Sequence, residues 1–347
     1  MVCLFLALTG CGTRTELWGD VSIAPLELDC PTSLDDPRLP LFFAGRPGTL
    51  DAVAFVVGTP THYKWSVVER DCDAIATLAR YELLNAQDAV VQFTPGRPAP
   101  YQLRLVVGDA AQRTQSCEFE VPVQGQGMRV ELCWRDDTSV DLDLFLHSPY
   151  SRAPFLEFLP TISEFGRETV ELLPNADSCN VYNCATHMRG GQPRVDFGYP
   201  ESSPEVCLAG PDPQQFLASG ICPNPRSATD TNTLAPSSEG TRGLAEIIHL
   251  DEAQEGDTFR VMVHNFNNRP AYLRLFVYCN GVRTAFEPPA FPVNFVAENP
   301  GTRGVMWRPF DMVARYDSSS RLGCALLGVE HPELPGQPYL TINDASY

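Results

Sequence analysis

Residues 140–149 read VDLDLFLHSP, and this stretch decides the fold class. Side chains alternate across a β-strand, so its two faces differ in chemistry. One face carries Val140, Leu142, Leu144 and Leu146, and the other carries Asp141, Asp143 and Phe145. A strand with one apolar face packs that face on the core of a sheet protein. The two aspartates then share the opposite face, either in solvent or with a cation between them.

Short apolar runs broken by Pro, Gly and Asp recur along the rest of the chain. Six lie in residues 39–123: LPLFFAG, AVAFVVG, HYKWSVVE, DAVVQFTP, YQLRLVVGD and CEFEVPV. Others follow the Gly-containing linker 124–127: MRVELCW, LAEIIHL, GDTFRVMVHNF, AYLRLFVYCNG and VRTAF. This spacing predicts an all-β chain of two consecutive antiparallel β-sandwiches, at 39–123 and 128–347. The tail from residue 288 carries strand patterns and is expected to return to the second sandwich.

The charge balance excludes some classes of partner. The net charge is -18 and the sequence pI is about 4.7. Nucleic-acid binding depends on Lys and Arg that displace counterions from phosphate, so we expect no nucleic-acid partner. The same balance argues against docking on anionic lipid through a basic patch.

The N-terminus predicts export and lipid anchoring. The apolar run Val2–Leu8 is too short to span a bilayer, and it ends in Leu8-Thr9-Gly10-Cys11. This stretch resembles the lipobox of bacterial lipoproteins, which implies a signal peptide at 1–10, a lipidated Cys11 and a tether at 11–38. Gly12 follows the cysteine, where inner-membrane lipoproteins usually carry Asp. The resemblance therefore favours an outer-membrane lipoprotein of the cell envelope, on its periplasmic side or the cell surface.

Export makes the cysteines interpretable as disulfides. Of twelve cysteines, Cys3 falls in the signal and Cys11 carries the lipid, which leaves ten. They are Cys30, Cys72, Cys117, Cys133, Cys179, Cys184, Cys207, Cys222, Cys279 and Cys324. Loop closure and strand position favour the pairs Cys179–Cys184, Cys207–Cys222 and Cys279–Cys324. Each sandwich then holds an odd number of cysteines, so we expect Cys133 to pair across the boundary with Cys30, Cys72 or Cys117.

A Pro/Gly/Ser-rich excursion covers residues 187–243. So long a loop in a compact domain is functional or partly disordered. Closing it with Cys207 and Cys222 would limit its entropy. We interpret the excursion as a displayed binding element, with Tyr199 and Phe216 as candidate ligand-contacting aromatics.

The first sandwich resembles known modules. The run YKWSV, followed by VVQFTPGRPAPYQLRLVVGD, is similar to the immunoglobulin-like and PKD-type modules of bacterial exoproteins. In those modules a Trp strand packs on the core, and a Tyr leads into the strand before an Asp turn. The matching residues here are Trp65, Tyr101 and Asp109. The usual G-D-G after the Trp strand is absent.

The second sandwich, over roughly residues 128–287, resembles exported domains of the pre-peptidase C-terminal type and related uncharacterised bacterial surface domains. The matching features are Asp141 and Asp143, CNVYNC at 179–184, NPRSATD at 224–230 and GDTFRVMVHNF at 256–266. The resemblance implies a jelly-roll-like sandwich used for display or binding, and it does not imply catalysis.

The aspartates of this region form a candidate Ca²⁺ site. Ca²⁺ takes six to eight oxygen ligands, and carboxylates on one strand face supply two of them. The candidate ligands are Asp137, Asp141, Asp143 and Asp230, with Asp136, Asn180 and Asp196 as further oxygens. A solvated acidic edge, which discourages aggregation between edge strands, is the alternative.

No catalytic motif of a serine hydrolase, a zinc protease, a P-loop or a dinucleotide-binding enzyme occurs in the sequence. We therefore expect no enzyme, and no cofactor apart from Ca²⁺. The first hypothesis is a lipid-anchored binding or adhesion module whose ligand is an envelope protein or glycan. The alternatives are a structural subunit of an envelope or surface assembly and, third, a hydrolase of an extracellular polymer.

Overall fold

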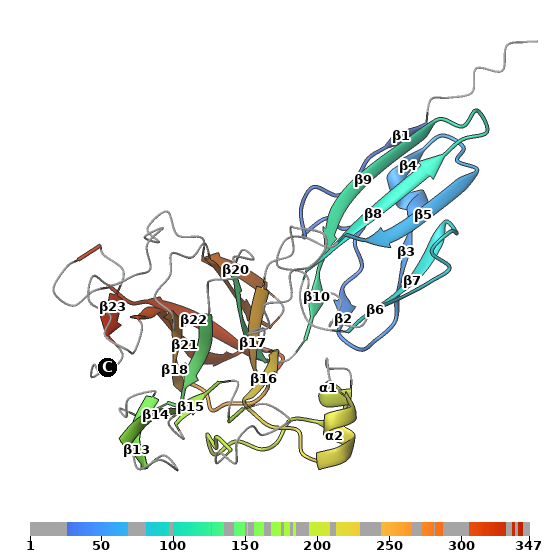
Figure 1. The fold of residues 1–347 in the computed structure, drawn as a ribbon. Coiled ribbons are helices and arrows are strands. Elements are labelled where there is room, and N and C mark those ends of the chain that lie inside the picture. Colours follow the sequence, from blue (N-terminus) through green and yellow to red (C-terminus); the bar gives the residue numbers. More distant parts are fainter. Residues whose placement is uncertain are drawn as a thin grey trace, which may run out of the picture.

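In the part of the chain that the structure describes, β-strands predominate, the helices are short, and the strands form two bodies (Figure 1). The computed structural model describes residues 26–68, 81–96, 100–125, 127–134, 142–149, 151, 156–162, 168–174, 177–180, 183–184, 194–208, 213–229, 244–265, 273–280, 282–286, 305–330, 335–336 and 339–342. One hydrophobic core lies between Leu26 and Val123, and a separate one gathers residues from Met128 onward. The predicted all-β class with two consecutive sandwiches is confirmed.

The first sandwich has the strand order of an immunoglobulin-like domain. Its sheets run β3-β7-β6 and β5-β8-β9, and β2 pairs with β10 in parallel. These sheets correspond to the two facing layers of the immunoglobulin fold. The elements are β1 (Glu27–Leu28), β2 (Phe42–Phe43), β3 (Gly48–Asp51), the 3-10 helix η1 (Ala52–Phe55), β4 (Val56–Val57), β5 (His62–Val67), β6 (Tyr81–Leu84), β7 (Val90–Pro95), β8 (Tyr101–Gly108), β9 (Thr114–Val121) and β10 (Val123–Gln124).

Alternation along β7 and β8 builds the core of this sandwich. Their inward side chains are buried, and the intervening ones are partly or fully exposed. Trp65 lies in the core, donates its indole N–H to the carbonyl of Asp88 at 3.1 Å, and meets Phe119 edge to face. Tyr101 opens β8 and packs edge to face on Phe93. The two aromatics that support the resemblance therefore anchor the core.

Two hairpins use the same five-residue turn, in which an Asp folds back on an Arg four positions later. In the β8–β9 turn, Oδ1 of Asp109 accepts from the amides of Ala111 and Arg113, and Oδ2 accepts from the Arg113 guanidinium. Asp317 does the same with Ser319 and Arg321 between β21 and β22. The sequences DAAQR and DSSSR share only the Asp and the Arg. Those two residues therefore carry the turn.

Because of these turns, we expect the folded protein to lose stability at low pH. The backbone hydrogen bond from Arg321, with its side chain, holds the pKa of Asp317 below its usual value. Burial raises the pKa of Asp109, but the hydrogen bonds from Arg113 outweigh it and the net pKa is lowered. A lowered folded-state pKa stabilises the protein above the unfolded pKa, and this contribution is lost as pH falls through the folded value. Melting temperature measured below about pH 4 should therefore fall less steeply in Asp317→Asn than in the parent chain. An unchanged slope would contradict this role of the carboxylate.

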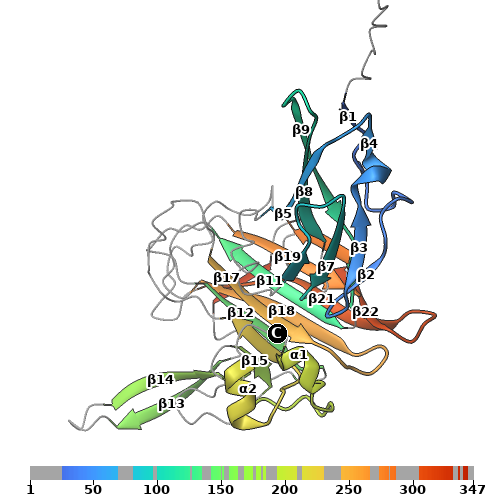
Figure 2. The same cartoon turned by 90° about the vertical axis from the view of Figure 1, so that its right-hand side faces the viewer.

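The second sandwich stacks a five-stranded sheet, β16-β17-β11-β19-β20, on a six-stranded one, β15-β12-β18-β21-β22 with β23 on β21. The chain passes repeatedly between the sheets, from β11 to β12 and from β17 to β18 to β19, a feature shared with jelly rolls. Figure 2 shows the β13–β14 hairpin projecting away from both sheets. The elements are β11 (Met128–Trp134), β12 (Leu142–His147), β13 (Leu156–Ile162), β14 (Glu168–Pro174), β15 (Ser178–Cys179), α1 (Pro204–Leu208), α2 (Pro213–Ser219), β16 (Arg226–Thr229), β17 (Leu244–Leu250), β18 (Thr258–Asn265), β19 (Leu273–Cys279), β20 (Val282–Phe286), β21 (Val305–Tyr316), β22 (Leu322–Gly328) and β23 (Tyr339–Ile342).

The β12 strand has the predicted apolar face, but its second face is not open to solvent as expected: Phe145 is 2% exposed and His147 has no exposed surface. Leu142, Leu144 and Leu146 lie in the core between the sheets. Asp143 lies on the other face, opposite His264 of β18. Glu246 reaches across the core from β17 and accepts the Leu144 amide at 2.5 Å. This carboxylate therefore satisfies one buried backbone amide of β12.

Four disulfides join described residues: Cys30–Cys117, Cys179–Cys184, Cys207–Cys222 and Cys279–Cys324. The last three are the predicted pairs. Cys279 ends β19 in one sheet, and Cys324 lies in β22 of the other. This bridge therefore holds the two sheets of the second sandwich together at one end.

The connection between the sandwiches is short, and its last residue, Gly127, is hydrogen-bonded to the second sandwich. Gln124 belongs to β10, so the predicted linker begins within a strand. Gly127 donates to the Leu322 carbonyl at 3.1 Å and accepts from Asn280 at 3.2 Å. Its φ is +103°, and a Cβ there would lie 2.7 Å from the Leu250 carbonyl oxygen. This backbone position accommodates only glycine.

Two side-chain contacts reinforce this connection, which we call the joint between the sandwiches. Arg283 of β20 pairs with Glu120 of β9 at 3.1 Å. Arg321, from the second Asp–Arg turn, donates to the side chain of Gln124. The joint is therefore a packed contact between the two sandwiches.

We expect a disulfide across this joint at Cys133. Cys133 is disulfide-bonded and 1% exposed. The four bridges above use the other cysteines of the described residues, so its partner lies outside them, among Cys3, Cys11 and Cys72. Since the first two belong to the expected signal and lipid site, non-reducing peptide mapping should recover Cys72–Cys133. A mapped bridge to any other cysteine would contradict the predicted pairing.

Candidate functional site

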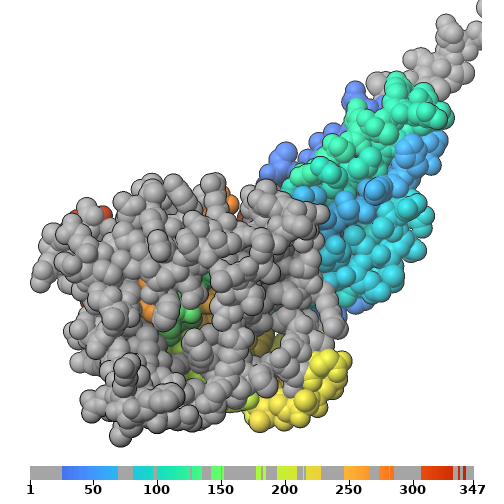
Figure 3. Space-filling model, in the orientation of Figure 1, coloured from blue at the N-terminus to red at the C-terminus, as the bar shows by residue number. Residues whose placement is uncertain are grey.

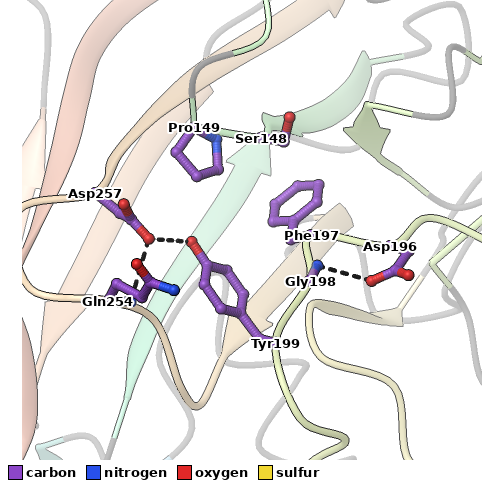
Figure 4. Close-up of a pocket in the computed structure, with 8 residues that line it drawn as sticks. All are labelled: Ser148, Pro149, Asp196, Phe197, Gly198, Tyr199, Gln254 and Asp257. Carbon is purple, nitrogen blue, oxygen red and sulfur yellow. Dashed lines mark hydrogen bonds between the residues drawn. The ribbon is translucent and has the colours of Figure 1, made fainter.

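A pocket of about 400 Å³ opens on the second sandwich (Figure 4). The β17–β18 turn, which lines the pocket, follows Leu250, and Leu250 pairs with Met128 at the start of β11. The pocket therefore lies at the end of the second sandwich where the chain enters from the first. Three segments form it: the residues after β12, the loop before α1, and the β17–β18 turn. The lining residues are Ser148, Pro149, Asp196, Phe197, Gly198, Tyr199, Gln254 and Asp257.

A buried polar network ties the loop before α1 to the β17–β18 turn. The Asn224 amide donates to the carbonyls of Pro200 and Glu252, both at 3.1 Å. Arg226 forms an ion pair with Asp251, and Ser202 donates to the same carboxylate at 2.5 Å. Buried charges are stable only when paired and hydrogen-bonded in this way. The NPR stretch at 224–226 thus fixes the loop before α1 against the β17–β18 turn, and both segments line the pocket.

The CNVYNC stretch supports the start of the same loop. Asn183 accepts the Asn180 amide within the ring closed by Cys179–Cys184 and donates to the carbonyl of Ser178, which precedes that ring. Its own carbonyl accepts the amide of Val195, whose side chain lies in the core. The residue before Asp196 is therefore held in place by the short disulfide.

Two aromatic side chains form one wall of the pocket. The Phe197 ring stacks on Phe259 at 6.1 Å with a 20° interplanar angle. Tyr199 lies 6.4 Å from Phe197 and 6.1 Å from Phe259. Phe259 is fully buried in the core. The aromatic wall thus rests on the sandwich itself.

Two carboxylates belong to the lining and lie at opposite ends of it (Figure 4). Asp257, only 2% exposed, accepts from the Tyr199 hydroxyl at 2.5 Å and from the Gln254 amide at 3.2 Å. Asp196 is exposed and accepts the Gly198 amide at 2.7 Å. Both carboxylates are therefore oriented by neighbouring N–H or O–H donors before any ligand arrives.

The predicted site residues have different outcomes. Tyr199 lines the pocket, whereas Phe216 lies on α2 and is not among the lining residues. Cys11, Asp137, Asp141 and Asp230 lie outside the described residues. Asp143 is described, and its carboxylate is 3.1 Å from Nδ1 of His264, which is 1% exposed.

No cluster of three or more potential metal ligands occurs among the residues that the structure describes. Ca²⁺ binding by the Asp141 and Asp143 face stays a prediction. If those carboxylates hold the ion, added Ca²⁺ should raise the melting temperature by mass action, and the Asp141→Asn/Asp143→Asn double variant should lose the response. Equal melting in Ca²⁺ and in chelator would favour the solvated acidic edge.

Several pocket residues carry no motif in the sequence. Phe197 lies more than fifty positions before Gln254 and Asp257, and no spacing rule joins it to them. The only local signal is the run DFGY at 196–199, with two aromatics around a glycine. This run is recognisable as part of a site only once the structure shows that the β17–β18 turn lies next to it.

The two facing sheets in each half define a two-sandwich, all-β protein. Comparisons with known proteins do not define its class more narrowly. No family model and no curated protein matches the chain. One solved structure that matches is that of protocadherin gamma B2 extracellular cadherin domains 3–6, at 9% identity and a TM-score of 0.18. The match covers 89% of this chain and 66% of the cadherin chain. In the described part of the chain, neither helix has the length and hydropathy to cross a bilayer.

Proposed function

We propose that this protein is a lipid-anchored binding or adhesion module of the bacterial cell envelope, and that the pocket at Phe197 and Tyr199 holds its ligand. The proposal rests on the interactions that hold the segments lining this pocket in place. The loop that carries the aromatic wall is held by a short disulfide, a largely buried ion pair and partly buried hydrogen bonds. Such preorganisation lowers the entropic cost of binding. Exposed loops without a binding role seldom need it.

The envelope location rests on the disulfides and the N-terminus. Four bridges between described residues fit an oxidising compartment. Lipid attachment rests on Leu8-Thr9-Gly10-Cys11 alone. Cys11→Ser should move the protein from the membrane fraction to the soluble fraction after cell lysis. Membrane retention of that variant would rule out this anchor.

The binding role is tested by filling the pocket. Gln254→Trp places a large ring on the lining while the backbone amide that donates to Asp257 is kept. Glu252→Trp is the matched control, because it adds the same ring to the same turn at an exposed residue outside the lining. The full chain carrying Cys11→Ser is applied to an array of envelope and extracellular polysaccharides and proteins. We expect binding that Gln254→Trp abolishes and Glu252→Trp keeps. Equal binding by both variants would remove the pocket from the proposal.

A structural-subunit role is the second candidate, favoured by the stapled α1–α2 segment. In the space-filling view this segment (yellow) lies on the surface of the second sandwich (Figure 3). It exposes Leu208, Leu217 and Ile221, the second by 62%. Exposed apolar side chains mark protein contacts where they form one contiguous patch. Leu217→Glu should weaken co-purification of an envelope complex if this role is correct, and should leave pocket binding unchanged.

A hydrolase is the third candidate. Asp196 and Asp257 line one pocket, and paired carboxylates are the groups that cleave glycosidic bonds. Release of reducing ends from a bound polysaccharide, lost in Asp257→Asn, would replace the binding role with this one.

A further inference from the structure

We infer that the pocket ligand is a neutral, hydroxyl-rich sugar, a hexose unit of a glycan. This inference rests on the proposed binding function and adds the chemical class of the ligand. It follows from the charges, the shape and the hydrogen-bonding groups of the lining residues.

The charge of the lining excludes anionic ligands. Of the eight residues drawn in Figure 4, two are carboxylates and none is Lys, Arg or His. A phosphate, sulfate or uronate at this place would meet Asp196 and Asp257 with no compensating cation in the lining. Like charges at such short range disfavour binding strongly.

The aromatic wall suits the flat face of a sugar ring. The Phe197 ring stacks with an offset on the buried Phe259, and Phe197 lines the pocket. A pyranose has aliphatic C–H groups on its faces and hydroxyls at its edge. Its apolar face packs on an aromatic ring, and its hydroxyls extend sideways. The volume of about 400 Å³ is near the lower end of the range for small-ligand sites.

The polar groups around that wall match an edge of hydroxyls. A hydroxyl both donates and accepts hydrogen bonds, so it uses acceptors and donors together. Asp196 supplies an exposed acceptor, Gln254 supplies an amide with both functions, and Ser148 supplies a hydroxyl. An ammonium or guanidinium group also favours carboxylates and aromatic faces. It has no acceptor, however, and makes no use of the amide and hydroxyl donors.

The experiment titrates the full chain carrying Cys11→Ser with three kinds of probe by calorimetry. The neutral probes are cellobiose, maltose and lactose, the anionic probes are glucuronate and heparin disaccharides, and the cationic probes are a glucosamine disaccharide and a Lys-Arg peptide. We expect at least one neutral probe to bind, and neither charged set to bind more tightly.

Two variants connect the binding to the wall. Phe197→Ala should weaken it at least tenfold. Asp196→Asn keeps an acceptor for the Gly198 amide and should weaken binding about threefold, since a neutral amide replaces a charged acceptor. Phe216→Ala on α2 and Glu252→Gln in the turn are the matched controls and should bind as the parent does. Melting curves show which variants are folded, and Asp196→Asn serves as the test if Phe197→Ala is not.

The outcomes separate the two proposals. If only charged probes bind, and Phe197→Ala abolishes that binding, the sugar class is overturned and the binding module stands. If no probe binds, or all variants bind equally, both the sugar class and the pocket are overturned.

Discussion

Replacement of Cys30 and Cys117 together by Ala is expected to lower the free energy of unfolding of the first sandwich by about 4 kcal/mol. The bridge spans a sequence separation of 87 residues. Closing a longer loop removes more conformational entropy from the unfolded chain, so this bridge constrains it more than a short one does. It attaches the segment after β1 to β9, on the edge of one sheet. For a domain of this size the melting temperature should fall by roughly 15 °C or more.

Differential scanning calorimetry measures this effect if the transition of each sandwich is resolved. The matched control is the Cys207→Ala/Cys222→Ala variant, whose loop has a sequence separation of 15 and lies beside α1 and α2. It should leave the transition of the first sandwich unchanged. Equal melting of this sandwich with and without Cys30–Cys117 would contradict the expected role of the bridge.

Phe259→Ala is expected to destabilise the second sandwich by about 3–5 kcal/mol and also to abolish pocket binding. Phe259 has no exposed surface, so truncation leaves a cavity in the core. The same ring supports Phe197 and Tyr199 from below. Without it, both aromatics lose their orientation, and the pocket loses the wall on which a ligand packs.

The control for this variant is Leu275→Ala. Leu275 is equally buried in the same core but belongs to β19 of the opposite sheet. It should destabilise the sandwich by about 2–5 kcal/mol and keep pocket binding at temperatures where the chain is folded. If Phe259→Ala binds as well as Leu275→Ala under those conditions, the aromatic wall is not the ligand contact.

The class of the fold was predictable because alternation is a local property. The residues of β12 and β8 show in sequence which side faces a core, and the structure buries Leu144 and Leu105 accordingly. Two aromatics at familiar spacing, Trp65 and Tyr101, were sufficient to suggest the immunoglobulin-like half. Three disulfides were predictable for related reasons: two close short loops, and the third joins a strand end to the returning tail.

The candidate site was predictable only in part. Tyr199 was identifiable as an aromatic in a displayed loop, and the structure places it in the pocket. Phe216, selected on the same grounds, lies on a helix outside it. The composition of a loop does not indicate which way each side chain points. That direction depends on contacts with residues elsewhere in the chain.

By itself, the sequence determined the all-β architecture, the acidic surface and most of the disulfide framework, since these follow from periodicity, composition and loop length. Only the tertiary structure decided that Asp257 meets Tyr199, that Phe197 rests on Phe259, and that Asp143 pairs with His264. The physical reason is the same in each case. These partners are brought together by strand register and by packing between two sheets, and neither is encoded in the residues next to them along the chain.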